Sequence, residues 1–178
     1  AQTTAVTVTD VNDQTPAVSV ASTYSQAEAT ATTFQTYTIT DSDTSGTYTC
    51  TLAGTDAADF TASISGKVCT VVWAAAPDYD SAADDGGNNV YDITLAFSDG
   101  TNDLAAQTTA VTVTDTNDQT PAATVAATYS QAESTATTFQ TYTITDSDTT
   151  GTYTCTLAGT DAADFTASIS VKVCTVVW

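Results

Sequence analysis

Hydrophobic and polar residues alternate with a period of two along most of the chain. In the segment "GTYTCTLAG", Tyr48, Cys50 and Leu52 fall on one face and threonines on the other. Such alternation, in segments rich in β-branched and aromatic residues, is typical of half-buried β-strands. The same pattern predicts strands at 34–41, 46–54, 67–73, 90–100 and 108–115.

Turn signals separate these strands, and they favour an all-β fold. Segments such as "DSDTSG", "DDGGNN" and "SDGTND" are rich in residues that favour turns. A helix competes only in the alanine-rich residues 23–33, where β-branched threonines lower the helix propensity. About seven short strands in roughly 105 residues predict a Greek-key β-sandwich of the immunoglobulin-like kind.

The chain repeats itself. Residues 1–73 align with residues 106–178 at an offset of 105, and 66 of the 73 positions are identical. A period of this length fits one small sandwich domain, so the repeat predicts tandem domains with separate cores. We expect residues 1–16 to be the last strand and linker of a preceding repeat, 17–121 a complete repeat, and 122–178 the first part of the next. We expect a window cut from a longer array; strand addition between copies is the alternative.

Composition narrows the classes of function. The chain has 21 acidic residues, two lysines, no arginine and no histidine, and a net charge of −19. Nucleic acid and anionic membranes need a basic surface, so neither is an expected partner. No apolar run reaches the length of about 20 residues that spans a bilayer, so we expect no membrane insertion. Without histidine or arginine the usual general bases and anion clamps are missing, and we expect no enzyme.

The four cysteines favour disulfides in an oxidising, extracellular place, at the cell surface or secreted. Cys50 and Cys69 lie 19 residues apart, as do Cys155 and Cys174. If both cysteines of a pair face the core, a bridge within the domain is feasible, and closing that loop would stabilise by roughly 3 kcal/mol. Free buried thiols and a bridge between chains are the alternatives.

Several short acidic motifs carry a resemblance. "DVNDQTP" at 10–16, which returns as "DTNDQTP", resembles the DxNDNxP linker that closes a cadherin repeat. In family order follow Glu28, "DSD" like DxD, the hairpin "ADFTASISGK", "DYD" like the LDRE or LDYE motif, and "FSDG" like AxDxG. The chain is similar to the cadherin-like repeats of large bacterial surface proteins, which implies tandem cadherin-like domains with calcium-binding linkers.

Calcium explains why such acids are spread out, because it takes six to eight oxygen ligands, more than one turn supplies. The resemblance implies a cation site at each of two junctions. At the first junction, linker acids meet acids of the repeat that follows. At the second junction, acids of the preceding repeat, of the linker and of the following repeat all take part. The implied ligands are Asp10, Asn12, Asp13, Asp41, Asp43 and Asp99 at the first junction, and Glu28, Asp78, Asp80, Asp115, Asn117, Asp118, Asp146 and Asp148 at the second.

Three departures from the family pattern predict fewer ions or weaker binding. Asp80 stands where the family has Glu, and Gln14 and Gln119 replace an Asn of the linker. The "DSDTSG" turn lacks the Asn that follows in the family, and Thr47 would offer only a carbonyl in its place. Two other features have a simpler interpretation. Residues 84–89, "DDGGNN", are expected to form a polar turn, with a further cation as the alternative, and each lysine is expected to form a salt bridge, with an isopeptide bond as the alternative.

Two functions follow from the resemblance and the repeat. The first is structural: a calcium-stiffened stalk or filament of tandem repeats on a microbial surface, with assembly between identical repeats or chains. The alternative is an adhesin whose repeats bind a surface glycan or a partner protein. The near-identity of the repeats favours the first, because a uniform repeat suits length and regular assembly better than a specialised pocket.

Overall fold

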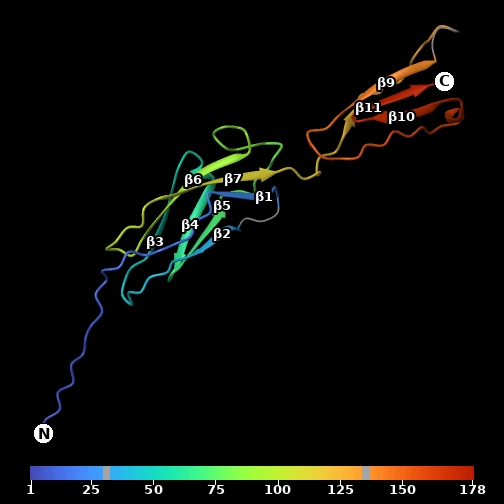
Figure 1. Cartoon of the computed structure of the whole chain (residues 1–178). Coiled ribbons are helices and arrows are strands. Elements are labelled where there is room, and N and C mark those ends of the chain that lie inside the picture. Colours follow the sequence, from blue (N-terminus) through green and yellow to red (C-terminus); the bar gives the residue numbers. More distant parts are fainter. Residues whose placement is uncertain (30–32, 134–136) are drawn as a thin grey trace. The chain divides into compact units, whose positions relative to one another are not determined.

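A computed structural model of the chain describes residues 1–29, 33–133 and 137–178 (Figure 1). Its contacts divide the chain into unit 1, Ala1–Thr114, and unit 2, Asp115–Trp178. Each unit consists of β-strands and a short 3-10 turn. Within these residues no helix is long and apolar enough to cross a membrane.

Unit 1 is a sandwich of two sheets. One sheet has the strand order β1-β7-β6-β3 and the other the order β2-β5-β4. β1 runs parallel to β7, and the other pairs are antiparallel. The strands are β1 (Thr23–Ala27), β2 (Thr33–Thr38), β3 (Thr49–Ala53), β4 (Phe60–Ser65), β5 (Val68–Trp73), β6 (Val90–Ser98) and β7 (Gln107–Thr114), with the 3-10 turn η1 at Ala57–Asp59.

The core lies between the two sheets, where the period-two pattern places the large side chains. Along β6, Tyr91, Ile93, Leu95 and Phe97 are buried, while the residues between them are more exposed. Trp73 of β5 packs edge-on against Tyr91, with ring centres 4.9 Å apart. The all-β sandwich predicted from the alternation is therefore confirmed, with seven strands among the described residues of unit 1.

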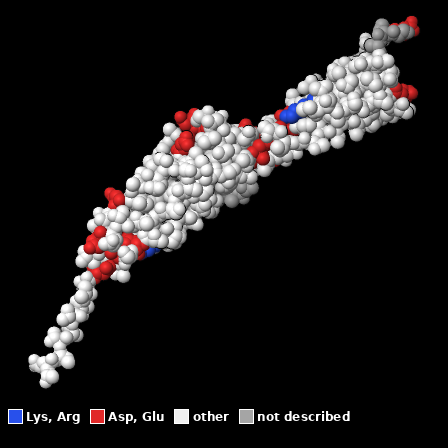
Figure 2. All heavy atoms as spheres, viewed as in Figure 1, with Lys and Arg blue, Asp and Glu red and all other residues white. Residues whose placement is uncertain are grey.

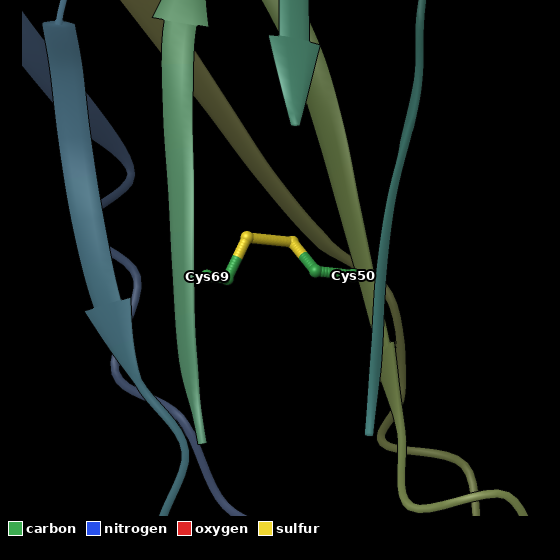
Figure 3. The surroundings of a disulfide bond; sticks show 2 residues. All are labelled: Cys50 and Cys69. Carbon is green, nitrogen blue, oxygen red and sulfur yellow. A yellow bond between two sulfur atoms is a disulfide. The ribbon is translucent and has the colours of Figure 1, made fainter. Parts of the chain in front are cut away.

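A disulfide joins the sheets of unit 1 through this core. Cys50 lies on β3 of one sheet and Cys69 on β5 of the other, and the bond spans the gap between them (Figure 3). The two Cα atoms are 6.0 Å apart, within the usual range for a bridge. Cys155 and Cys174 are also bonded to each other, although Cys155 lies outside any strand of unit 2, so the predicted pairing within each repeat is confirmed.

Unit 2 keeps one of the two sheets. Its sheet has the order β10-β11-β9-β8, in which β9, β10 and β11 correspond to β2, β4 and β5 of unit 1 at the 105-residue offset. The counterparts of β1 and β3 carry no strand. In unit 1 these two strands pair with β7 and β6, and no strand takes the place of these partners among the described residues of unit 2. The elements are β8 (Ala122–Ala123), β9 (Thr138–Thr145), η2 (Ala162–Asp164), β10 (Thr166–Ser170) and β11 (Val173–Val177).

The predicted strand "TTAVTVTD" shows the same dependence. Residues 108–114 of this string belong to β7, but the identical residues 3–9 carry no strand. Val8 is 91% exposed, whereas its counterpart Val113 is 1% exposed. The assignment of residues 1–16 to a preceding repeat stays a prediction. The helix alternative at 23–33 is wrong for residues 23–27, which form β1, and residues 30–32 lie outside the described part of the chain.

Candidate metal centre

Three carboxylates of unit 1 converge where the loop after β2 meets the end of β6. Asp41, Asp43 and Asp99 each offer an oxygen atom, and these oxygens lie within 4.8 Å of one another. Asp43 is 4% exposed and Asp99 is 1% exposed, so two of the acids are buried. The backbone N–H of Thr47 donates to the carbonyl oxygen of Asp99 at 2.7 Å and holds the two segments together. We call Asp41, Asp43, Asp99 and the neighbouring Asn12 the DSD cluster.

The linker lies directly on this cluster. The backbone N–H of Gln14 donates to Oδ2 of Asp43 at 2.7 Å, and the carbonyl oxygen of Gln14 accepts from Nδ2 of Asn102 at 3.0 Å. Oδ2 of Asp10 accepts from the N–H of Thr44 at 2.7 Å and from its hydroxyl at 2.8 Å. Residues 10–14 are thereby tied to the repeat that follows them.

The amide of Asn12 can present either of its ends to two carboxylates. In one orientation its nitrogen donates to the Thr101 hydroxyl at 3.0 Å, and its oxygen faces Oδ2 of Asp43 and Oδ2 of Asp99. In the other orientation the nitrogen donates to those two oxygens, at 3.0 Å and 3.1 Å. The second orientation suits a metal-free cluster. The first brings three oxygen atoms together, the arrangement that a hard cation requires.

Hydrogen bonds favour the charged form of two of these acids. Burial raises the pKa of Asp99, but the N–H groups of Asn102 and Thr101 and the amides of Asn102 and Asn12 outweigh it, so that the pKa lies below its usual value. The N–H and hydroxyl of Thr44 likewise lower the pKa of Asp10. Both side chains are therefore carboxylates at neutral pH.

A second group of acids lies where β1 ends. Glu28, Asp78 and Asp80 offer oxygens within 4.8 Å of one another, and Glu28 is 2% exposed. The N–H of Tyr79 donates to Oε2 of Glu28 at 2.6 Å, which fixes the glutamate against the 78–80 segment. We call these three acids the Glu28 cluster. Structure and resemblance thus group the same three residues.

In unit 2 the linker contacts recur. The N–H of Gln119 donates to Oδ2 of Asp148 at 2.9 Å, and the hydroxyl and N–H of Thr149 both donate to Asp115 and lower its pKa. Asp146 accepts from the N–H of Asp148 at 3.1 Å. Asp148 is fully buried, and its Oδ1 has no hydrogen-bond partner among the residues that the structure describes. A buried carboxylate oxygen of this kind suits a ligand that supplies positive charge.

Three of the expected ligands lie at the surface, outside the groups of converging carboxylates. Asp13 and Asp118 are exposed, and each accepts at 2.8 Å from the side-chain amide of the glutamine that follows it. Asn117 is exposed, whereas Asn12 is half-buried by the turn that contains Asp99.

The acids of the 84–89 segment are already engaged with the backbone. Asp84 accepts from the N–H groups of Asn88 and Asn89, at 3.0 Å and 2.9 Å. The buried Asp56 accepts from the N–H groups of Asp85 and Asp92, each at 2.7 Å. These bonds support the prediction of a polar turn. The role of Asp56 escaped sequence analysis, because it depends on contacts between distant segments.

The two lysines contact the same loop in each unit. Nζ of Lys67 donates to the carbonyl oxygens of Asp41 and Asp43, at 2.9 Å and 3.3 Å, and lies 5.2 Å from the ring centre of Tyr48. We expected a carboxylate partner, and the structure shows backbone carbonyls instead. In Figure 2 both blue patches of lysine lie beside red acidic atoms.

The donor set of the DSD cluster fits calcium. Its side-chain donors are carboxylate and amide oxygens, and calcium prefers oxygen ligands without demanding strict geometry. The orientation of Asn12 that faces its oxygen toward Asp43 and Asp99 adds a neutral ligand to three charged ones. Sulfur ligands are engaged in the disulfides and histidine is absent from the sequence, which argues against zinc.

Comparison with solved structures identifies the fold. The chain superposes on protocadherin gamma B2 extracellular cadherin domains 1-5 with a TM-score of 0.60 at 17% identity, over 95% of this chain and 33% of that one. It superposes on protocadherin gamma B7 extracellular cadherin domains 1-4 with a TM-score of 0.65 at 19% identity, over 94% of this chain and 42% of that one. For human protocadherin-24 EC1-2 the TM-score is 0.63 at 18% identity, over 93% of this chain and 80% of that one.

These likenesses show that the chain has the fold of cadherin extracellular domains. The chain spans about one third of the length of the protocadherin gamma B2 structure. No protein-family model matches the chain, and no curated protein matches it significantly. At identities below 25% the likeness establishes the fold and leaves function to be argued from the site.

Proposed function

We propose that the chain is part of an extracellular array of cadherin-like repeats that calcium stiffens, and that the array serves as a stalk or filament on a microbial surface. The observation that carries the proposal is the docking of linker residues 10–14 on the DSD cluster. A cation held by Asp43, Asp99 and Asn12 would bind linker and repeat at once. Loss of the cation would leave carboxylates that repel one another at that point.

The repeat and the charge support a structural role. Residues 1–73 and 106–178 are nearly identical, so each linker presents the same acids to the next repeat. We propose that residues 1–16 belong to a preceding repeat, that 17–121 is a whole repeat and that 122–178 begins the next. With a net charge of −19, such an array needs bound cations to limit its self-repulsion.

The disulfides support the extracellular location. Each closes a loop within its own unit and suits an oxidising environment. A uniform repeat also offers the same surface many times, which suits assembly between identical repeats or chains. The interdomain ligands proposed for the Glu28 cluster are Asp115, Asn117 and Asp118 of the following linker, as the resemblance implies.

The experiment that tests the proposal compares the chain in calcium and in chelator. Small-angle scattering should give a larger radius of gyration and a narrower range of conformations in calcium, reversed when the ion is chelated. Images of the native material would then separate the two forms, since helical order with lateral contacts indicates a filament and isolated threads a stalk. Identical scattering in calcium and chelator would contradict the stiffening.

A further inference from the structure

Each repeat carries its lysine at the same place, directly before the strand that holds the second cysteine. Lys67 precedes β5, and Lys172 precedes β11. These are the two cationic side chains of the whole sequence. Nζ of Lys172 donates to the carbonyl oxygens of Asp146 and Asp148, at 2.7 Å and 3.0 Å, as Lys67 does in the first repeat. The contact therefore recurs with the repeat.

The ammonium group engages the backbone of the loop and leaves the carboxylates to other partners. Oδ1 of Asp41 accepts from the N–H of Asp43 at 3.0 Å, and Oδ2 of Asp41 accepts from the Tyr48 hydroxyl at 3.2 Å. Lys67 bonds to both aspartate carbonyls, and its own carbonyl oxygen accepts from the N–H of Ile39 at 2.7 Å. The lysine thus connects the start of β5 to the loop on both sides of Ser42.

We propose that Lys67 and Lys172 are positioning residues of the cation sites. Lys67 holds the backbone at Asp41 and Asp43, and Lys172 holds it at Asp146 and Asp148, so that the two carboxylates converge before a cation arrives. The inference rests on the proposed function, because it assumes that a cation binds the DSD cluster. Two charge-assisted hydrogen bonds from the lysine fix the loop against the repulsion between its carboxylates. The loop is then already ordered when the cation binds, so that binding does not have to supply the free energy of ordering it.

A lysine near a cation site affects calcium affinity in two opposite ways, so the direction in which the affinity changes on substitution tests the inference. Its positive charge repels a divalent cation, so removing the charge alone would tighten calcium binding. Removing the loop's anchor would weaken it. We expect the loss of the anchor to dominate, because Lys67 contacts both carbonyls directly while its charge is half-exposed and screened by water and salt.

The experiment is a calcium titration of the whole chain, followed by nitrogen–proton NMR. The backbone N–H groups of Thr101 and Asn102 both donate to Oδ1 of Asp99 at 2.7 Å, so their signals report on the DSD cluster of the first repeat. The variant Lys67→Met keeps an apolar stem over Tyr48 and removes the charge and the donors. We expect its calcium midpoint at these two signals to rise at least threefold.

The controls separate positioning from stability. Lys172→Met changes the same contact in the other repeat and should leave the Thr101 and Asn102 midpoints unchanged. Lys67→Arg restores charge and donors and should recover part of the loss. If Lys67→Met does not fold, Lys67→Gln replaces it, with a smaller rise expected. A midpoint that stays unchanged or falls in the folded variant would overturn the inference, even where the melting temperature in chelator drops.

The response of the parent chain to calcium separates a failure of the proposed function from a failure of the inference about Lys67. If its Thr101 and Asn102 signals do not respond to calcium, the proposed function fails and the inference fails with it. If they respond with the same midpoint in the parent and in Lys67→Met, the inference alone fails.

Discussion

The substitution Asp43→Asn tests the DSD cluster through the stability of the repeat. Asp43 is buried, its carboxylate lies within 4.8 Å of two others, and its Oδ2 accepts the N–H of Gln14 at 2.7 Å. Asparagine has the same shape and keeps one oxygen for Gln14, so the change removes charge and one ligand with little effect on packing. In calcium we expect weaker binding by about tenfold or more, because one of three carboxylates of the site is lost.

The size of the effect follows from linkage between binding and folding. At calcium concentrations well above the dissociation constant, each tenfold loss of affinity removes about 1.4 kcal/mol of stabilisation. For a domain of this size, that lowers the melting temperature by roughly 6 °C or more. In chelator we expect the variant to melt at or above the temperature of the parent, because one source of repulsion is gone.

The assay is thermal melting followed by circular dichroism, in calcium and in chelator. Asp103→Asn is the matched control: Asp103 is exposed and lies outside the DSD cluster, and the change in net charge is the same. The control should lose none of the calcium-dependent stabilisation. An equal fall in melting temperature for Asp43→Asn in calcium and in chelator would refute the reasoning, since the aspartate would then act in packing alone.

Three further predictions concern the sandwich itself. Replacing Cys50 and Cys69 together by alanine should lower the free energy of unfolding by about 3 kcal/mol in urea denaturation, and an unchanged midpoint would contradict the role of the bridge. Val171, at φ 52°, occupies the left-handed conformation that Gly66 adopts at φ 57° in the first repeat; Val171→Gly should stabilise unit 2 by about 1 kcal/mol and Gly66→Val should destabilise unit 1, as differential scanning calorimetry would show. Burial raises the pKa of Tyr91 above its usual value of 10.0. The stability that the neutral Tyr91 phenol contributes is therefore complete below pH 10 and is lost as pH rises through the raised pKa. Tyr91→Phe should make unfolding less steep above pH 10, and an alkaline unfolding curve identical to that of the parent chain would refute this.

Five strands of unit 1, namely β2, β3, β5, β6 and β7, could be predicted because the period-two pattern is local. The pattern places Tyr91, Ile93, Leu95 and Phe97 on one face of β6, and that face is the core. Whether a predicted strand forms is not a local property, because a strand needs a partner for its backbone hydrogen bonds. The string "TTAVTVTD" therefore gives β7 at one position and an exposed segment at the other.

The acids of the candidate site could likewise be predicted from the sequence, whereas the groups that hold them in place could not. The acids Asp41, Asp43 and Asp99 could be predicted because the resemblance preserves their order along the chain, and the structure brings them together. The donors that hold them, such as the N–H of Gln14 and the ammonium group of Lys67, come from segments far apart in sequence. Nothing in a lysine before a strand indicates that it bonds to loop carbonyls, and the acidic composition favours a salt bridge instead.

The most direct test of the account is a crystal structure of the chain grown with calcium, with anomalous diffraction used to locate the ion. The account predicts an anomalous peak in the DSD cluster, bonded at about 2.3–2.6 Å to oxygens of Asp43, Asp99 and Asn12. The Asn12 amide should then have its oxygen toward the ion. A cluster that holds only water at a saturating calcium concentration, with the Asn12 nitrogen donating to both carboxylates, would contradict the account.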